Sequence, residues 1–213
     1  MYNYILFDLD GTLTDPAEGI TNSVAYALLK YGITVEDRTT LYKFIGPPLK
    51  DSFMNYYGFS EEDAIKAIEY YREYFKPKGM LENKVYDGIP ELLAEIKRQG
   101  KKVILATSKP EVFAVEILKH FDLYKYFDFV AGATLDGTRS KKGDVIAYAL
   151  AQTGITDKSQ CLMVGDRAQD INGARENGID SLGVLYGYGD REEHENANAT
   201  YIAESVSDIL RFI

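Results

Sequence analysis

The pattern of apolar positions divides the chain into a helical stretch and a regular alternation of strands and helices. Residues 4–7 form a short apolar run that ends at the turn Asp8-Leu9-Asp10-Gly11-Thr12. An apolar run of this length before a glycine is typical of a buried strand. Residues 16–80 then show only helical spacing, with patterns at 16–31, 41–45, 51–57 and 60–75. We therefore expect a helical insertion after the first strand.

From residue 87 onward, short apolar runs alternate with segments of helical periodicity. The expected strands lie at 103–106, 128–131, 161–164 and 181–185. The expected helices lie at 89–98, 111–119, 143–153 and 168–177, followed by a loop at 187–199 and a closing helix at 205–212. Short strands that alternate with helices are typical of βαβ units and of a parallel sheet covered on both faces.

Together these patterns predict an α/β fold with two domains. Residues 1–15 and 81–213 are expected to form a doubly wound, Rossmann-like parallel-sheet core. Residues 16–80 are expected to form a small α-helical cap domain. Because ligands of such sheets bind at the carboxyl ends of the strands, the active site is expected there, between core and cap.

Composition narrows the possible partners of the protein. The 213 residues carry a formal net charge of −9 at pH 7, which argues against nucleic acid as the main partner. We find no apolar run of membrane-spanning length and no signal-peptide pattern, so no membrane partner is expected. The single cysteine, Cys161, fits a cytoplasmic protein. A monomer and a homodimer both remain open.

The polar residues that could carry chemistry all follow predicted strands. They are Asp8 and Asp10 after the first strand, Thr107 and Ser108 after the second, Lys141 and Lys142 after the third, and residues 165–170 after the fourth. In a parallel sheet these strand ends share one edge, which would collect carboxylates, hydroxyls and a lysine. Such a set suits phosphoryl transfer, which needs a metal, a cation for the phosphate and a nucleophile.

These residues resemble the motifs of the haloacid dehalogenase superfamily. The turn at 8–12 resembles its first motif, Asp-x-Asp-Gly-Thr, and Thr107 resembles the second, a Ser or Thr that ends a strand. Lys142 resembles the third motif, and Gly165-Asp166 through Asp170 resembles the fourth, Gly-Asp-x-x-x-Asp. The helical stretch 16–80 resembles the small cap that lies between the first two motifs. The likeness covers essentially the whole chain.

Two further segments narrow the resemblance to one branch. Ile45-Gly46-Pro47-Pro48-Leu49 and Thr107-Ser108-Lys109-Pro110 resemble phosphoglycolate phosphatase-like proteins. The second aspartate of the first motif, Asp10, points to phosphate rather than haloalkanoate chemistry. The implied activity is Mg²⁺-dependent hydrolysis of a small phosphomonoester, such as phosphoglycolate or a sugar or nucleoside phosphate.

The resemblance also implies a role for each motif residue. Asp8 would be the nucleophile that becomes an aspartyl phosphate, and Asp10 would be the general acid and base. The implied metal-site residues are Asp8, Asp10 through its backbone carbonyl, Asp166 and Asp170, the last mainly ordering the site. Thr107 and Lys142 would complete the catalytic set by binding phosphoryl oxygens. The expected substrate-binding residues are Gly11, Thr12, Thr107, Ser108, Lys142 and Lys50.

Several alternatives stay open at this point. Lys141 competes with Lys142 for the phosphate-binding role. Lys50 follows a stiff Gly-Pro-Pro-Leu loop that could act as a lid, and it could bind a substrate carboxylate or be simply solvated. A sugar phosphomutase, similar to β-phosphoglucomutase, would use the same motifs. A phospho-acceptor receiver domain is a more distant alternative, because receivers have no helical insertion. The pattern does not identify the substrate.

Overall fold

The computed structural model describes residues 2–213, which form two compact units. One unit consists of residues 2–15 and 85–213, and the other of residues 16–84. The chain passes between them through β2 (Thr14–Asp15) and β3 (Lys84–Val85), which form a two-stranded sheet.

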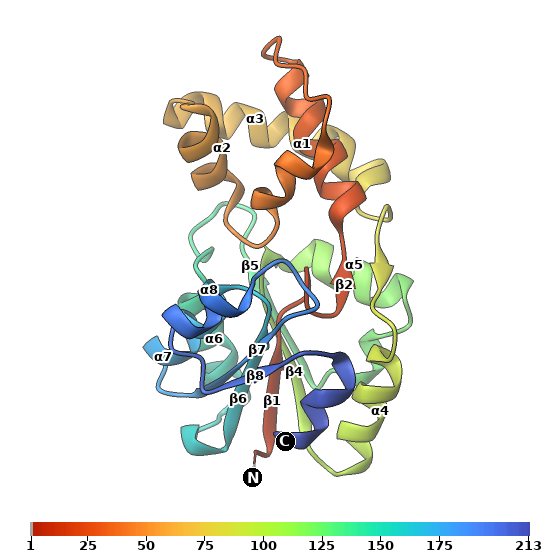
Figure 1. The fold of residues 1–213 in the computed structure, drawn as a ribbon, viewed down its shortest axis with the longest axis vertical. Coiled ribbons are helices and arrows are strands. Elements are labelled where there is room, and N and C mark those ends of the chain that lie inside the picture. The colour runs from red at the N-terminus through yellow and green to blue at the C-terminus, as the bar shows by residue number, and fades with distance from the viewer. Residues whose placement is uncertain (1) are drawn as a thin grey trace. The chain divides into compact units, whose positions relative to one another are not determined.

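The first unit is built on a six-stranded parallel sheet with the order β5-β4-β1-β6-β7-β8 (Figure 1). The strands are β1 (Tyr4–Phe7), β4 (Lys102–Pro110), β5 (Phe129–Ala133), β6 (Cys161–Gly165), β7 (Asp180–Val184) and β8 (Tyr201–Ala203). The chain starts at the centre, extends to one edge through β4 and β5, and then builds the other half from β6 to β8. This order reverses beside β1, which confirms the predicted doubly wound α/β fold.

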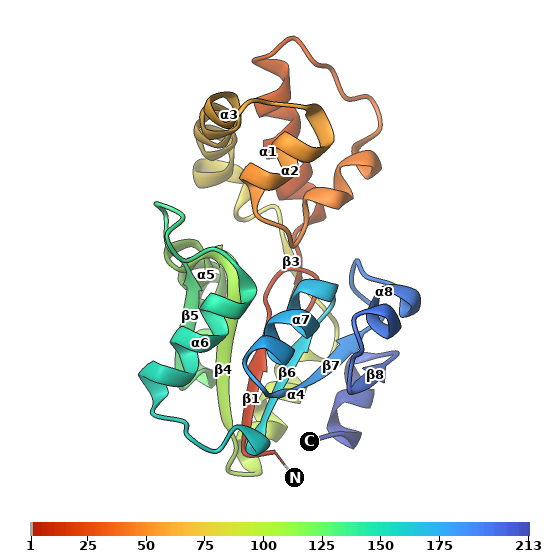
Figure 2. The ribbon, with the colours of Figure 1, turned by 90° about the vertical axis from the view of Figure 1, so that its left-hand side faces the viewer.

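Helices cover both faces of this sheet. Helices α6 (Lys142–Thr153) and α7 (Ala168–Glu176) lie on one face, and α4 (Ile89–Arg98) and α5 (Glu111–His120) lie on the other (Figure 2). Leu6 of β1 and Met163 of β6 belong to the core cluster formed with α6 and α7. Their neighbours in sequence point to the opposite face, because side chains alternate along a strand. Both faces are therefore apolar, as the unbroken hydrophobic runs of the strands predict.

The C-terminal segment differs from the sequence prediction in three ways. The expected loop at 187–199 contains a short helix, α8 (Arg191–Asn196), whose first turn is capped by the Asp190 side chain accepting from Glu193 N at 2.8 Å. The edge strand β8 was missed because three residues are too few to show a pattern. The closing segment is a 3₁₀ helix, η5 (Val206–Arg211).

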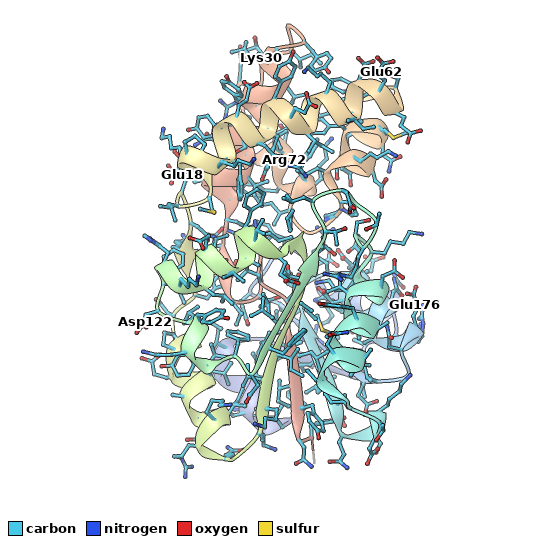
Figure 3. The ribbon with its side chains drawn as sticks, turned by 180° about the vertical axis from the view of Figure 1, so that it is seen from behind. Glu18, Lys30, Glu62, Arg72, Asp122 and Glu176 are labelled. Carbon is cyan, nitrogen blue, oxygen red and sulfur yellow. The ribbon has the colours of Figure 1, made fainter. Side chains whose placement is uncertain are left out.

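The second unit is helical, as predicted for the cap. It contains α1 (Ala17–Leu29), the 3₁₀ helix η1 (Arg38–Phe44), α2 (Leu49–Tyr57), α3 (Glu61–Tyr74) and the π-helical turn η2 (Phe75–Gly79). Glu62 and Arg72, both on α3, lie near the two ends of that helix (Figure 3). Aromatic side chains pack α2 against η1 and the following loop; Phe53, for example, stacks on Phe59 with 5.7 Å between ring centroids.

The cap unit ends four residues later than the expected boundary at residue 80. Glu82 explains the difference, because its backbone carbonyl accepts a hydrogen bond from Gly19 N at 2.9 Å. The Glu82 carboxylate also accepts hydrogen bonds from Asn22 and Tyr74, each at 3.1 Å. These contacts hold residues 80–84 against α1 and α3. No helix within residues 2–213 is both long and apolar enough to cross a membrane.

Candidate active site

Asp8 and Asp10 lie where β1 ends, and both are buried, with 4% and 7% of their surface exposed. The N–H of Asp8 donates to Val164 O at 2.9 Å, so the sheet ladder continues to the first residue of the motif. The chain then turns back sharply at Gly11, whose φ of 82° lies in the left-handed region that favours glycine. This turn keeps both carboxylates at the edge of the sheet.

The N–H groups of Gly11 and Thr12 are already used within this turn. Gly11 N donates to Thr14 O at 2.7 Å, and Thr12 N donates to Leu9 O at 3.3 Å. Both residues also accommodate Asp166. The Thr12 hydroxyl donates to Asp166 Oδ1 at 3.3 Å, and the missing side chain of Gly11 makes room for the Asp166 carboxylate. Both residues thus support Asp166, and their contact with a substrate stays a prediction.

Asp166 follows β6, the neighbour of β1 in the sheet, and is fully buried. Besides Thr12, its carboxylate accepts a hydrogen bond from Tyr188 N at 2.8 Å. A Cβ atom on Gly187 would collide with Asp166 as well, so glycines enclose the carboxylate on both sides. Asp166 is therefore held in one position by donors and by close backbone packing.

Lys142, the first residue of α6, forms ion pairs with Asp8 of the first motif and Asp170 of the fourth. Its Nζ atom lies 2.8 Å from Asp8 Oδ1 and 2.8 Å from Asp170 Oδ1, and it donates to Ala106 O at 3.0 Å. The neighbouring Lys141 is exposed. Of the two lysines left open by the sequence, the structure thus places Lys142 in the carboxylate cluster.

Lys109 is a member of the cluster that the sequence analysis missed. It lies near the end of β4, is buried, and its Nζ atom is 2.8 Å from Asp10 Oδ2. Thr107, also buried, is two residues earlier, and its hydroxyl accepts from Lys109 N at 3.2 Å. Residues two apart on a strand share one side, so extending the strand beyond Thr107 would have pointed to Lys109. Ser108, between them, is half-buried.

The buried charges of this site do not balance. Four aspartates, Asp8, Asp10, Asp166 and Asp170, are buried together with only two lysines, Lys109 and Lys142. If all are ionised, the sum is −4 + 2, an excess of two negative charges. Buried charges are costly unless they are paired, so this set is suited to a divalent cation.

The excess of buried negative charge is also reflected in raised pKa values of the aspartates. Burial, reinforced by the charges of Asp170 and Asp8, raises the pKa of Asp166 well above its ordinary value. Burial also raises the pKa of Asp170 to about 6, although Lys142 acts in the opposite direction. Burial raises the pKa of Asp10, and Lys109 opposes this shift. A cation among these groups would favour their charged forms.

Three of the four predicted metal-site aspartates lie together. Asp8, Asp166 and Asp170 each offer a carboxylate oxygen, and these oxygens lie within 4.8 Å of one another. All three are buried, and oxygen ligands of this kind suit Mg²⁺. The Asp10 carboxylate is paired with Lys109 instead, which leaves its backbone carbonyl as the group it could contribute. The residues present therefore fit a divalent metal.

Lys50 belongs to the cap unit, in the first turn of α2. Its side chain is 40% exposed and forms an ion pair with Glu61 at the start of α3. Within its unit it is thus a partly solvated, paired lysine. Its contact with a substrate stays a prediction.

The comparisons with known proteins agree with this geometry. The family model for haloacid dehalogenase-like hydrolases matches residues 5–184. A crystal structure described as a predicted phosphatase from Clostridium acetobutylicum is similar with a TM-score of 0.97 and 55% identity, and covers 100% of this chain and 98% of that one.

Relatives of known name carry several different names. A 5'-nucleotidase of Pseudomonas aeruginosa is 50% identical over 90% of this chain and 86% of its own. The tyrosine-protein kinase PtkA of Mycobacterium tuberculosis is 39% identical over 97% of this chain and 70% of its own. A phosphoglycolate phosphatase of Vibrio parahaemolyticus is 31% identical over 98% of this chain and 95% of its own. With its motif aspartates gathered at one sheet edge, the chain belongs to the haloacid dehalogenase-like hydrolase family and is a phosphatase within it.

Proposed function

We propose that the protein hydrolyses small phosphomonoesters with the help of Mg²⁺, through a phosphorylated Asp8. The observation that carries this proposal is the buried group formed by Asp8, Asp166 and Asp170, with Lys142 placed 2.8 Å from two of its oxygens. It combines a nucleophilic carboxylate, a set of metal ligands and a cation for phosphate oxygens. A purely structural salt bridge would not need the third carboxylate.

Each residue has a part in the proposed reaction. An Asp8 oxygen forms a bond to phosphorus while the bond to the leaving oxygen breaks, and the Asp10 carboxyl gives its proton to that oxygen. Asp10 then accepts a proton from the water whose oxygen bonds to phosphorus, and the bond to Asp8 breaks. Thr107 and Lys142 hold the phosphoryl oxygens. Mg²⁺, held by the aspartates, would supply positive charge to neutralise those oxygens.

The first substrate class to test is the nucleoside 5'-monophosphates. This choice rests on the 50% identical relative, which is named 5'-nucleotidase. Phosphoglycolate comes second, because the relative of that name is 31% identical. A sugar phosphomutase remains the alternative function. A mutase would also need a site that holds a second phosphate.

The experiment is a panel of nucleoside monophosphates, phosphoglycolate and sugar phosphates, followed by detection of inorganic phosphate. We expect steady phosphate release with Mg²⁺ from at least one class, no release in chelator, and no requirement for a bisphosphate activator. Interconversion of sugar phosphates without phosphate release would favour the mutase. Full activity in chelator would contradict the proposed use of metal.

The remaining expectations about partners and location are also proposals. A small phosphorylated metabolite is the proposed partner, and a cytoplasmic location is proposed from the single buried Cys161. Monomer and homodimer remain equal proposals for the assembly.

A further inference from the structure

The strongest unassigned feature is the ion pair between Lys109 and Asp10. Lys109 Nζ lies 2.8 Å from Asp10 Oδ2, and the two side chains are 5% and 11% exposed. The pair comes from the ends of two neighbouring strands, β4 and β1. It is separate from the contacts of Lys142, which reach Asp8 and Asp170. The ion pairs of the two buried lysines therefore involve different aspartates.

Only one oxygen of Asp10 is held by this pair. Its other oxygen, Oδ1, is buried and has no hydrogen-bond partner among residues 2–213. A carboxylate that is anchored through one oxygen and unpartnered at the other is ready to exchange a proton with a group that enters the site. A carboxylate with a purely structural role would normally have both oxygens satisfied.

The backbone that carries Lys109 is itself tightly placed. Its N–H donates to the Thr107 hydroxyl at 3.2 Å. On the next strand, a Cβ atom at Gly132 would lie 2.8 Å from Lys109 O, so the two backbones touch. The register between β4 and β5 shifts between Ala106 and Pro110, which marks an irregular strand end. Such irregularities often re-aim side chains next to active sites.

We propose that Lys109 is the positioning residue for the acid–base carboxylate, and that it fixes Asp10 through Oδ2 so that Oδ1 can exchange protons with the leaving group and with water. This inference rests on the proposed phosphatase reaction. Lys109 itself forms no bond to the substrate. Lys109 affects the reaction only by positioning Asp10, so its loss should slow only the steps that use Asp10.

The two half-reactions depend on Asp10 to different degrees. Attack of Asp8 on a nucleoside 5'-monophosphate needs a proton for the poor alkoxide leaving group. Attack on 4-nitrophenyl phosphate does not, because 4-nitrophenolate is a stable anion. Hydrolysis of the phosphorylated Asp8 needs a base for either substrate. Loss of Lys109 should therefore slow the attack on the nucleotide and the hydrolysis of phosphorylated Asp8. It should not slow the attack on 4-nitrophenyl phosphate, because that step does not need Asp10.

The experiment compares Lys109→Met with the wild type in rapid-mixing assays on both substrates. In the variant we expect kcat for the nucleotide to fall by about 100-fold, within the range of general acid–base catalysis. With 4-nitrophenyl phosphate we expect a rapid burst of one nitrophenolate per enzyme, followed by slow turnover. Lys101→Met is the matched control, because Lys101 is also buried beside β4 but donates to Tyr2 O at 2.7 Å. It should behave as the wild type.

A second variant covers the case that Lys109→Met leaves Asp10 unpaired and folds poorly. In the double variant Asp10→Asn, Lys109→Met neither charge remains. If Lys109 acts only through Asp10, the double variant should turn over as slowly as Asp10→Asn alone and no slower.

Three outcomes would overturn the inference. The first is that Lys109→Met slows the nitrophenolate burst as much as it slows nucleotide turnover. The second is that Lys109→Met raises KM and leaves kcat unchanged. The third is that the double variant has a lower kcat than Asp10→Asn alone. The second of these would instead make Lys109 a phosphate-binding residue. Failure of the wild type to release phosphate from any substrate would contradict the proposed function itself, independently of Lys109.

Discussion

Gly11 and Asp166 approach so closely that any side chain at position 11 would occupy the space of the Asp166 carboxylate. Gly11 comes from the turn after β1, and Asp166 follows the adjacent strand β6. The glycine of the first motif is therefore needed for two reasons, its φ of 82° and its contact with a proposed metal ligand. The two reasons can be separated by experiment.

We expect Gly11→Ala to lose most of its Mg²⁺ affinity and activity, because the new methyl group displaces Asp166. Gly100→Ala is the matched control, since Gly100 has a similar φ of 76° but nothing within 4 Å of its missing Cβ. The control should lose about 1 kcal/mol of stability from backbone strain and keep its activity. Calorimetric Mg²⁺ titration and urea unfolding would measure both effects. Equal Mg²⁺ affinity in the two variants would contradict this assignment.

Asp8→Asn should abolish turnover with the fold intact. Asparagine keeps the size of the side chain but cannot form the acyl phosphate, so we expect kcat to fall by at least about 1,000-fold. Phosphate release and circular dichroism would measure activity and folding. Substantial turnover in this variant would exclude Asp8 as the nucleophile.

Removal of metal should affect stability as well as activity. Because Asp8, Asp166 and Asp170 are buried together, Mg²⁺ should bind the folded chain and raise its melting temperature. At 100 times its dissociation constant the ion would add about 2.7 kcal/mol. Asp166→Ala should lose this response. Ca²⁺ should also stabilise the protein but inhibit turnover, because its coordination shell is larger and looser. A melting temperature that does not respond to Mg²⁺ would argue against the site.

The metal-free protein should respond to pH through Asp170. Burial raises the pKa of this carboxyl to about 6, above its usual value near 4, so the folded state binds its proton more strongly than the unfolded state. The resulting stabilisation is complete below about pH 4 and is lost as the pH rises through about 6. In chelator, the wild type should therefore lose stability relative to Asp170→Asn over this interval. Urea unfolding at several pH values would measure this difference, and a constant difference would refute the assignment.

Lys50→Ala tests whether the cap unit contributes to substrate binding. If Lys50 binds a substrate carboxylate, the variant should raise KM for phosphoglycolate several-fold more than for a neutral alkyl phosphate. Lys66→Ala is the matched control, because Lys66 is also an exposed lysine of the cap unit paired with a glutamate, Glu69. Both variants should lose less than about 1 kcal/mol of stability, as is usual for exposed ion pairs. An equal effect on all substrates would remove Lys50 from the site.

The central motif and the class of fold could be predicted because both depend on local sequence patterns. An apolar run that ends in Asp8 and Asp10 identifies a buried strand and its carboxyl end without further information. The alternation of strands and helices from residue 87 onward requires a parallel sheet, because connections of that length cover a face of the sheet. Parallel strands in turn gather Asp8, Thr107 and Asp166 at one edge.

Contacts between distant segments were decided by the tertiary structure. Lys141 and Lys142 are adjacent in sequence, but Lys141 precedes α6 in an extended conformation and is exposed, whereas Lys142 begins the helix and is buried beside Asp8. Lys109 became visible only when β4 extended past Thr107 and placed an ammonium group beside Asp10. The pairing of three-residue β8 with β7 likewise depends on an edge supplied by the rest of the sheet. Local periodicity specifies which residues form a strand or helix, whereas the partners of a buried charge are specified by packing in three dimensions.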